Sequence, residues 1–382
     1  MISEASIGNL FPTAPLGDVA EFLDSQRRPV TEADRRRGPY PYFGANGQQD
    51  SIDDFLFDEP LVLLAEDGGH FDDPNRGIAY RIDGKTWVNN HAHVLRPTDR
   101  VDWGYLCRVL ENYDVRRYVT GTTRAKLTQG SASEIPIPLP PLAEQRRIAD
   151  ILDRADTLRT KRRGAIARIS TLARNMFLQM FGDPFSDPRR WPETTLGAYA
   201  EFTGGGTPSR GRPEYFSGSV CWATSKDMTG EFMDDTEEHI TDEAIRQSAT
   251  KLVPADTILV VVKSKVLMHR LPVAISRVPT CFGQDLKGIS PDSGYWTVVF
   301  VATALRLGQR WLIERARGAN TEGLTLEHLR AFPMILPPLT LQNEFGARVR
   351  AVADLGTVAE RSLAQLDALF ASLQHRAFRG EL

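Results

Sequence analysis

Two long stretches of the chain place apolar residues at the spacing of an α-helix. In each stretch apolar residues recur mostly three or four positions apart, without an interrupting proline, which predicts an amphipathic helix. Each helix would span about 37 residues, or about 55 Å at a rise of 1.5 Å per residue. A helix of this length with a narrow apolar stripe needs a partner, so we expect the two helices to pack on each other. The stripe residues are Ile148, Ile151, Leu152, Ala155, Leu158, Ala165, Ile166, Ile169, Leu172, Met176, Phe177 and Met180 in the first stretch, and Phe345, Val349, Val352, Leu355, Leu363, Leu366, Leu369, Phe370 and Leu373 in the second.

The chain also repeats itself. Ile135-Pro-Ile-Pro-Leu-Pro-Pro-Leu142 precedes the first helical stretch, and Phe332-Pro-Met-Ile-Leu-Pro-Pro-Leu339 precedes the second, 197 residues later. The same offset places Gln145 on Gln342 and the apolar run 61–65 on 258–262. One register that matches both the prolines and the apolar positions indicates a tandem duplication.

The segments between the helices read differently. Residues 1–134 and 191–331 hold short apolar runs rich in β-branched residues, separated by Gly, Pro and Asn, which is typical of strands and turns. We therefore predict a mixed α+β fold (class α/β) of two domains in tandem pseudo-repeat, joined by two long antiparallel coiled-coil helices. The expected order is a first domain at 1–141, a helix at 142–183, a second domain at 184–338 that begins with a linker at 184–192, and a helix at 339–382.

Composition limits the class of protein. With 41% hydrophobic and 25% charged residues, the chain is not a wholly disordered one. No apolar run approaches the ~18 residues of a membrane helix, and the first residues do not read as a secretory signal. Cys107, Cys221 and Cys281 lie far apart in the sequence, so we expect neither a disulfide framework nor a zinc site. This use of cysteine fits a protein of the reducing cytoplasm, which is the location that we expect.

Charge and geometry together suggest a ligand. The net charge of −3 argues against unaided DNA binding, but the basic residues are clustered, and a local basic face can hold phosphates. Antiparallel helices would place the two domains apart, as needed to contact two separated patches of a duplex. Thr122-Thr-Arg-Ala-Lys126 in the first repeat becomes Ala319-Asn-Thr-Glu-Gly323 in the second, so the two domains would prefer different base edges.

Several segments in both halves of the chain resemble the specificity (S) subunit of type I restriction–modification systems. In the first half the resemblance rests on Glu66-Asp-Gly68, 84–93, 121–127 and above all 135–148; in the second half it rests on 204–209, 222–228, 283–285 and 332–345. It implies two target-recognition domains that bind double-stranded DNA at a bipartite, asymmetric target. It also implies docking onto two methyltransferase (M) subunits, with restriction (R) subunits added for cleavage. The S-adenosylmethionine, ATP and Mg²⁺ of the complex would then belong to the partners, with no cofactor, metal or catalytic residue in this subunit.

Candidate contacts follow from the basic and polar loops. For each one the alternative is structural, either a buried turn or a solvated helix face. We expect DNA contacts from Asn89, Asn90, His91, Arg124, Lys126, Thr207, Ser209, Arg210, Arg212, Lys226, Lys263, Lys265, Asn320 and Thr321, and partner contacts from Gln145, Arg147, Arg154, Lys161, Arg168 and Gln342.

Two other classes of function compete with this one. An orphan DNA methyltransferase or a nuclease would need catalytic motifs. Phe202-Thr-Gly-Gly-Gly206 matches the FxGxG of methyltransferases, but the chain has no [DNS]-P-P-[YFW] tetrapeptide and no P-loop. A coiled-coil adaptor without DNA selectivity is the other alternative.

Overall fold

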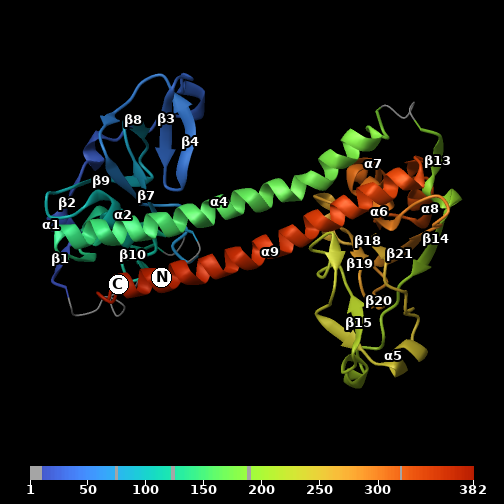
Figure 1. Cartoon of the computed structure of the whole chain (residues 1–382). Helices are drawn as coiled ribbons and strands as arrows, with labels where there is room; N and C mark the ends of the chain where they lie inside the picture. Colours follow the sequence, from blue (N-terminus) through green and yellow to red (C-terminus); the bar gives the residue numbers. More distant parts are fainter. Residues whose placement is uncertain (1–10, 74–75, 122–124, 187–190, 319–320) are drawn as a thin grey trace. The chain divides into compact units, whose positions relative to one another are not determined.

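The computed structural model describes residues 11–73, 76–121, 125–186, 191–318 and 321–382 (Figure 1). The chain forms two compact units, Met1–Arg163 with Arg361–Leu382 and Gly164–Glu360. Each unit holds one mixed α/β domain and about half of each of two long helices, α4 (Leu142–Phe181) and α9 (Leu339–Ala377). Among the described residues, none of the helices combines the length and apolarity that crossing a membrane requires.

The domain of the first unit is built on two four-stranded sheets. One has the order β2-β9-β6-β7, and its central strand β6 is buried along its whole length. The other has the order β4-β3-β8-β5. The two-stranded ladders β1-β12 and β10-β11 complete it. The elements are β1 (Thr13–Pro15), α1 (Leu16–Val19), β2 (Ala20–Phe22), β3 (Tyr40–Gly44), β4 (Gly47–Ile52), β5 (Phe57–Asp58), β6 (Leu61–Ala65), β7 (Ala79–Ile82), β8 (Lys85–Val88), β9 (Ala92–Pro97), α2 (Trp103–Glu111), β10 (Val119–Thr120), β11 (Lys126–Leu127), α3 (Gln129–Ser133) and β12 (Pro136–Pro138).

The domain of the second unit has a five-stranded sheet, β14-β21-β18-β19-β16, and a three-stranded sheet, β17-β15-β20. The ladders β13-β24 and β22-β23 correspond to the two ladders of the first domain. The elements are β13 (Glu193–Thr195), β14 (Ala200–Gly204), β15 (Val220–Ala223), β16 (Phe232–Met233), β17 (Glu238–Ile240), α5 (Asp242–Arg246), β18 (Thr257–Val261), β19 (Val273–Ser276), β20 (Thr280–Phe282), β21 (Leu286–Pro291), α6 (Val298–Leu307), α7 (Gln309–Ala316), β22 (Arg317–Gly318), β23 (Thr321–Glu322), α8 (Leu326–Arg330) and β24 (Pro333–Ile335).

The two long helices pack antiparallel, as the sequence predicted. In the first unit the beginning of α4 and the end of α9 share one core with the domain, which includes Ile148 and Phe370. In the second unit the end of α4 meets the beginning of α9, where Phe177 contacts the rings of Phe300 and Phe345 at centroid distances of 5.1 and 5.6 Å. The apolar stripes are therefore buried chiefly where a domain adds a third surface to the helix pair.

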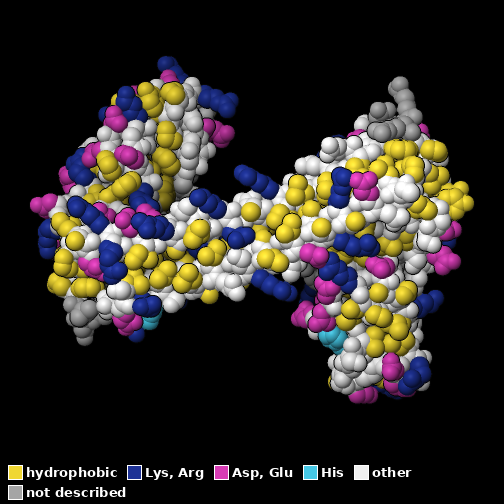
Figure 2. Space-filling view, in the orientation of Figure 1, with side chains coloured by type: hydrophobic (Ala, Val, Ile, Leu, Met, Phe, Trp, Pro, Cys, Tyr) yellow, Lys and Arg dark blue, Asp and Glu magenta, His cyan; other side chains and the backbone are white. Residues whose placement is uncertain are grey.

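Four leucines of the predicted stripes do not become buried. Leu158, Leu172, Leu355 and Leu369 are exposed by 54%, 39%, 62% and 49%. Leu158 corresponds to Leu355 in the repeat, and Leu172 to Leu369. Two helices alone cover only a narrow seam, so apolar positions at the edge of each stripe stay at the surface. Figure 2 shows hydrophobic side chains at the surface along the long helices.

A buried glutamine joins each long helix to its own domain. The Gln145 side-chain oxygen accepts from the backbone N–H of Asp102 at 2.7 Å, and its nitrogen donates to the carbonyl of Pro140 at 2.9 Å. Gln342 makes the same two bonds with Thr297 and Pro337, at 2.9 and 2.8 Å. Asp102 and Thr297 are the N-caps of α2 and α6. Each amide thus links the start of a long helix to the start of the domain helix beside it.

The repeat register of the central strands differs by one residue from the sequence comparison. That comparison placed 61–65 on 258–262, whereas the strands are β6 (Leu61–Ala65) and β18 (Thr257–Val261). Between this strand and the proline-rich segment before the long helix, the two repeats differ in length by one residue, and a comparison without gaps does not detect it. In a strand, a shift of one residue moves every side chain to the opposite face of the sheet. The residue that corresponds to Glu66 is therefore Val262, and Lys263 corresponds to Asp67.

Candidate nucleic-acid interface

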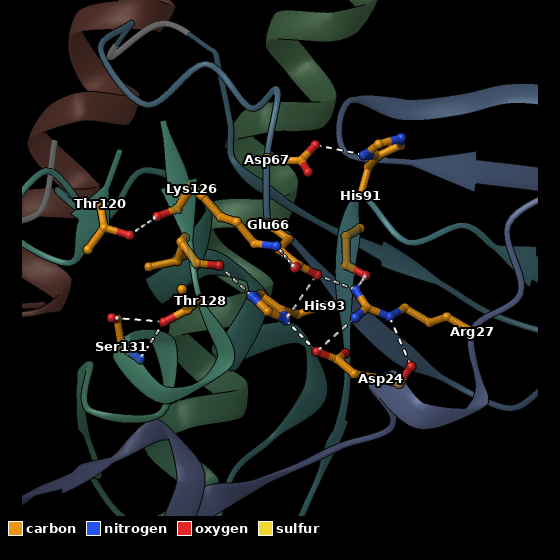
Figure 3. A network of polar contacts seen from close by, with 12 residues as sticks. Asp24, Arg27, Glu66, Asp67, His91, His93, Thr120, Lys126, Thr128 and Ser131 are labelled. Carbon is orange, nitrogen blue, oxygen red and sulfur yellow. Dashed lines mark hydrogen bonds and ion pairs between the residues drawn. The ribbon is translucent and has the colours of Figure 1, made fainter. Parts of the chain in front are cut away.

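Three segments far apart in the sequence meet at one end of the first domain (Figure 3). They are the chain that leaves β6 at Glu66, the turn between β8 and β9 at 89–91, and strand β11. Backbone hydrogen bonds join them: the N–H of Glu66 donates to the carbonyl of His91 at 2.9 Å, and the N–H of Leu127 donates to the carbonyl of Glu66 at 2.8 Å. Most of the first-domain residues expected to contact DNA lie on these three segments.

Glu66 is the acid at the centre of this arrangement. Its carboxylate accepts from the Arg27 guanidinium at 2.6 Å and from the Lys126 ammonium at 2.9 Å. Burial raises the pKa of the Glu66 carboxyl, but the hydrogen bonds from Lys126 and Arg27 outweigh it and hold that pKa below its ordinary value. Glu66 therefore stays ionised and fixes two cations near the surface.

His93 extends the network into the core. Its Nδ1 lies 2.5 Å from a carboxylate oxygen of Asp24, and its Nε2 lies 2.8 Å from the carbonyl oxygen of Leu127. Arg27 closes the network, because its guanidinium also lies 3.3 Å from Asp24. The charges at this end of the domain are thus largely paired with each other.

The structure separates the predicted residues of this end by exposure. Asn89 is buried: its side-chain oxygen accepts from the N–H of His91, and its nitrogen donates to the side-chain oxygen of Gln49. These bonds hold the turn and favour the structural alternative, and the DNA contact of Asn89 stays a prediction. Asn90 is exposed, and His91 is partly exposed with its Nδ1 2.6 Å from Asp67. Lys126 is half exposed while it pairs with Glu66. Arg124 lies outside the described residues.

The hairpin tip between β3 and β4 adds polar groups that the sequence analysis did not include. Asn46, Gln48 and Gln49 are exposed there. The Asn46 amide donates to the carbonyl of Gly68 at 3.0 Å, which ties this tip to the chain that leaves β6. Asn and Gln amides are the side chains that read adenine edges. The Asn46-Gly47 pair, with a φ of 106° at Gly47, was the available sequence signal, because Asn-Gly marks a tight hairpin.

The second domain builds the same junction with other residues. The N–H of Val262 donates to the carbonyl of Asp285 at 2.8 Å, and the N–H of Leu324 donates to the carbonyl of Val262 at 2.8 Å. These two bonds repeat those of Glu66 with His91 and of Leu127 with Glu66. Lys263 follows Val262 and is exposed, and Lys265 begins a short 3₁₀ turn nearby.

The side chains at the junction differ in charge between the two domains: two acids of the first domain are replaced by uncharged residues in the second, and its histidine by a lysine. Strand pairing puts Lys287 opposite Val260, as His93 is opposite Leu64, so Lys287 takes the place of His93. By the same registers Val262 replaces Glu66. Gly204 lies opposite Lys287, whereas the Asp24 side chain contacts His93, so Gly204 takes the place of Asp24. No hydrogen bond or ion pair of the Lys263 or Lys287 side chain occurs within the part of the chain that the structure describes. Lys287 was missed by the sequence analysis because it follows a buried leucine in a strand.

Two glycines of the run at 204–206 are needed for packing. A Cβ on Gly205 would lie 2.1 Å from the carbonyl oxygen of Gly283, and a Cβ on Gly206 would lie 2.4 Å from the backbone nitrogen of Thr250. Only glycine allows this approach of the loop to the neighbouring backbone. The run therefore keeps the following loop, which contains Thr207 and Ser209, close to the end of β20; both residues are exposed.

The remaining predicted residues of the second domain form a separate group. Arg210 pairs with Glu238 at 2.7 Å, and its guanidinium lies 4.2 Å from the ring centre of Phe216. Arg212 donates to the Tyr215 hydroxyl at 2.6 Å. Lys226 is exposed and lines a surface pocket with Arg210 and Glu238. Asn320 lies outside the described residues, and only the backbone of Thr321, in β23, is described.

The residues expected to contact a partner also divide by exposure. Gln145 and Gln342 are 1% and 0% exposed with their amides occupied, which gives them a role inside the fold; their expected partner contact stays a prediction. Arg147 is exposed and pairs with Glu144. The exposed candidates Arg154, Lys161 and Arg168 lie on α4, and none has an ion pair among the described side chains.

Comparison with known proteins places these features in a family. The model of the type I restriction modification DNA specificity domain matches twice, at residues 11–169 and 188–366. A putative type I restriction enzyme specificity subunit of Haemophilus influenzae is 38% identical over 36% of this chain and 36% of its own length. A type I restriction enzyme specificity subunit of Escherichia coli is 35% identical over 44% of this chain and 42% of its own length. The chain thus aligns with less than half the length of these curated relatives.

The fold has a counterpart along the whole chain. The S subunit of a type I restriction–modification system from M. genitalium, a solved crystal structure, has a TM-score of 0.68 and covers 97% of both chains at 16% identity. At that identity the likeness concerns the fold, and the two matches of the family model decide the family. The chain belongs to the family of type I restriction–modification DNA specificity domains, of which it carries two in tandem.

Proposed function

We propose that this chain is the specificity subunit of a type I restriction–modification complex and that it recognises a bipartite, asymmetric DNA target without catalysing a reaction itself. The observation that carries the proposal is the repeated junction. Both domains join the end of a central buried strand, a turn and a short hairpin by the same backbone bonds, but with different side chains. Equal scaffolds with different contact groups would read two different half-targets.

The first domain would read its half-target mainly through amides. Asn46, Gln48, Gln49 and Asn90 are exposed around the junction, while Arg27 and Lys126 are held by Glu66. Amides pair with adenine edges in the major groove, and base contacts rather than phosphate contacts supply specificity.

The second domain would bind more through charge. Neither Lys263 nor Lys287 forms an ion pair with a residue that the structure describes, so each would be available for a phosphate or a guanine edge. Thr207, Ser209 and Lys265 belong to the same proposed half-site.

The long helices would dock two methyltransferase subunits, one for each repeat. The repeat-related leucines Leu158 and Leu355, and Leu172 and Leu369, are exposed apolar groups on α4 and α9. Exposed apolar groups flanked by Arg154, Lys161 and Arg168 suit a protein partner. The S-adenosylmethionine of the methyltransferases, and the ATP and Mg²⁺ of restriction subunits, would be bound outside this chain.

Mapping of methylation sites tests the proposal. The chain is co-expressed with the methyltransferase encoded next to it, in a host without DNA methylation, and the modified bases are sequenced. We expect N6-methyladenine at a split, asymmetric motif that disappears when this chain is omitted. Methylation that is the same without the chain would exclude the specificity role and favour the adaptor. Methylation by the chain alone would favour an orphan methyltransferase.

A lysine substitution tests the contact assignment within that complex. Lys287→Ala should weaken binding of the mapped target by about five- to tenfold or more, since a base or phosphate contact contributes about 1–3 kcal/mol. It should also reduce the slope of log K against log salt by about 1 if the contact is a phosphate. Arg246→Ala, which removes an exposed cation of α5 that pairs with Glu243 in the same domain, is the control. If the two variants bind the mapped DNA target with equal affinity, Lys287 does not contact the DNA.

A further inference from the structure

A thiol, a carboxylate and an imidazole converge on one face of the three-stranded sheet in the second unit. Cys221 of β15 and His239 of β17 are direct neighbours in the antiparallel register, so their side chains leave the sheet on the same side. Asp235 precedes β17. Its Oδ1 lies 3.6 Å from the Cys221 sulfur and 2.7 Å from the His239 Nε2. One carboxylate oxygen thus stands between the other two groups.

We propose that Cys221, Asp235 and His239 form a Zn²⁺ site. The three groups offer a sulfur, an oxygen and a nitrogen, which are the ligand types of protein-bound zinc. In a tetrahedral site with the usual bond lengths, the sulfur and the carboxylate oxygen would be about 3.5 Å apart. The observed separation is 3.6 Å.

Small movements would complete the geometry. The His239 nitrogen and the Asp235 oxygen would have to separate from 2.7 Å to about 3.3 Å. The Asp235 side chain is 74% exposed and has room to move, whereas Cys221 is fixed in a buried strand. Binding would release the thiol proton to solvent as the zinc–sulfur bond forms, and the open side at Asp235 would leave the fourth position to a water molecule.

A second cluster shows why this one differs. Asp24, Glu66 and His93 also bring their ligand atoms within 4.8 Å of one another. There, however, the Arg27 guanidinium and the Lys126 ammonium lie 2.6 and 2.9 Å from Glu66 and supply the positive charge that a metal would bring. Among the described side chains, no Lys or Arg forms an ion pair with Asp235. Its Oδ1 accepts from the N–H of Thr236 at 2.9 Å and faces the His239 imidazole, so no permanently charged side chain takes the place of a metal there.

The site would hold an edge of the domain in place. β17 is an edge strand of the β17-β15-β20 sheet, and a metal between Cys221 and His239 would link it to β15. Glu238 lies next to His239 and pairs with Arg210 at 2.7 Å. Zinc would therefore hold β17, whose Glu238 positions Arg210, and its role would be structural.

Cobalt replacement in the full chain tests the site. The purified protein is freed of metal with a chelator and titrated with Co²⁺, which reports four-coordinate geometry by its visible bands and thiolate ligation by a near-ultraviolet charge-transfer band. We expect one Co²⁺ per chain with both signals, displacement by Zn²⁺, and a higher Tm of the zinc-bound form, because a ligand stabilises the state that binds it.

Substitutions identify the ligands. Cys221→Ser should abolish the charge-transfer band, and His239→Gln should weaken binding by about tenfold or more. Cys281→Ser, which removes another buried thiol of the same sheet, is the matched control and should keep both signals. Circular dichroism checks that each variant folds. The proposal is overturned if the wild type binds no Co²⁺ stoichiometrically, or if folded Cys221→Ser keeps the charge-transfer band.

Discussion

At the scale of single residues, Glu66 has a charge that the fold depends on. Its carboxylate, 11% exposed, binds Arg27 and Lys126, and burial, which raises its pKa, is outweighed by their hydrogen bonds, which lower it. Because the folded-state pKa is below the unfolded one, the stabilisation is present above about pH 4.3 and is lost as the pH falls through the folded-state pKa.

The first prediction concerns this pH dependence. Glu66→Gln should lower the free energy of unfolding by about 2 kcal/mol at neutral pH, because it leaves the largely buried Arg27 guanidinium poorly paired. The difference from the wild type should shrink in acid below about pH 4. Urea unfolding at several pH values measures it, with exposed Glu134→Gln as the control. A difference that stays constant down to pH 3 would contradict this account of Glu66.

The second prediction concerns Gln145. Gln145→Leu keeps the approximate size of the side chain but leaves the N–H of Asp102 and the carbonyl of Pro140 without their partner. We expect a loss of about 3 kcal/mol in the free energy of unfolding, since each unpaired buried group costs about 1–3 kcal/mol. Exposed Gln129→Leu should be close to neutral. Unchanged stability together with weaker methyltransferase binding would support the partner contact expected for Gln145.

At the scale of elements, each end of the helix pair depends on a domain. Phe177 is fully buried between α4, α6 and α9, where it meets Phe181, Phe300 and Phe345. Leu172, five residues earlier on the same helix, is 39% exposed. Helical position alone does not distinguish them, because both fit the apolar spacing.

The third prediction compares these two residues. Phe177→Ala should lower the free energy of unfolding of the second unit by about 3–5 kcal/mol, as expected for a large cavity in an aromatic core. Leu172→Ala should change it by less than about 1 kcal/mol and should instead weaken assembly with the methyltransferase. Chemical unfolding and a pull-down on the same two proteins separate the effects. If both variants destabilise the fold equally, Leu172 belongs to the core and is not a docking residue.

At the scale of the whole molecule, each unit has a hydrophobic core of its own. One core holds Leu16, Val62 and Tyr105, and the other holds Leu196, Val260 and Phe300. Exchange of one domain therefore leaves the packing of the other intact. If the target is bipartite as proposed, each domain then sets its own half of the motif.

The fourth prediction follows from this independence. Replacing residues 1–134 by the corresponding segment of a related specificity subunit should change one half of the methylated motif and leave the other half unchanged. Sequencing of modified bases reads the outcome, and exchange of residues 193–331 is the reciprocal control. A chimera that alters both halves would show that the domains do not read DNA independently.

The sequence alone determined the two helices, the duplication and the mixed α/β domains, because helical periodicity and proline punctuation are local properties of the chain. The antiparallel pairing of the helices, expected from the sequence, is set by the cores that each end of the pair shares with a domain. It also brought out the residues on which the family resemblance rests. It could not decide whether Asn89, Gln145 and Gln342 contact a ligand or hold the fold together, because a polar residue in a sequence gives no sign of the hydrogen bonds that the fold provides for it.

Only the tertiary structure decided which residues meet. The pairing of His93 with Asp24 and Glu66, and their replacement by Lys287, Gly204 and Val262, depends on strand register between distant segments. A one-residue difference in repeat offset, invisible in an ungapped comparison, changes which side chains face the junction. The same long-range pairing brings Cys221 to His239. Contacts of this kind arise from the packing of the whole domain, so no local pattern in the chain encodes them.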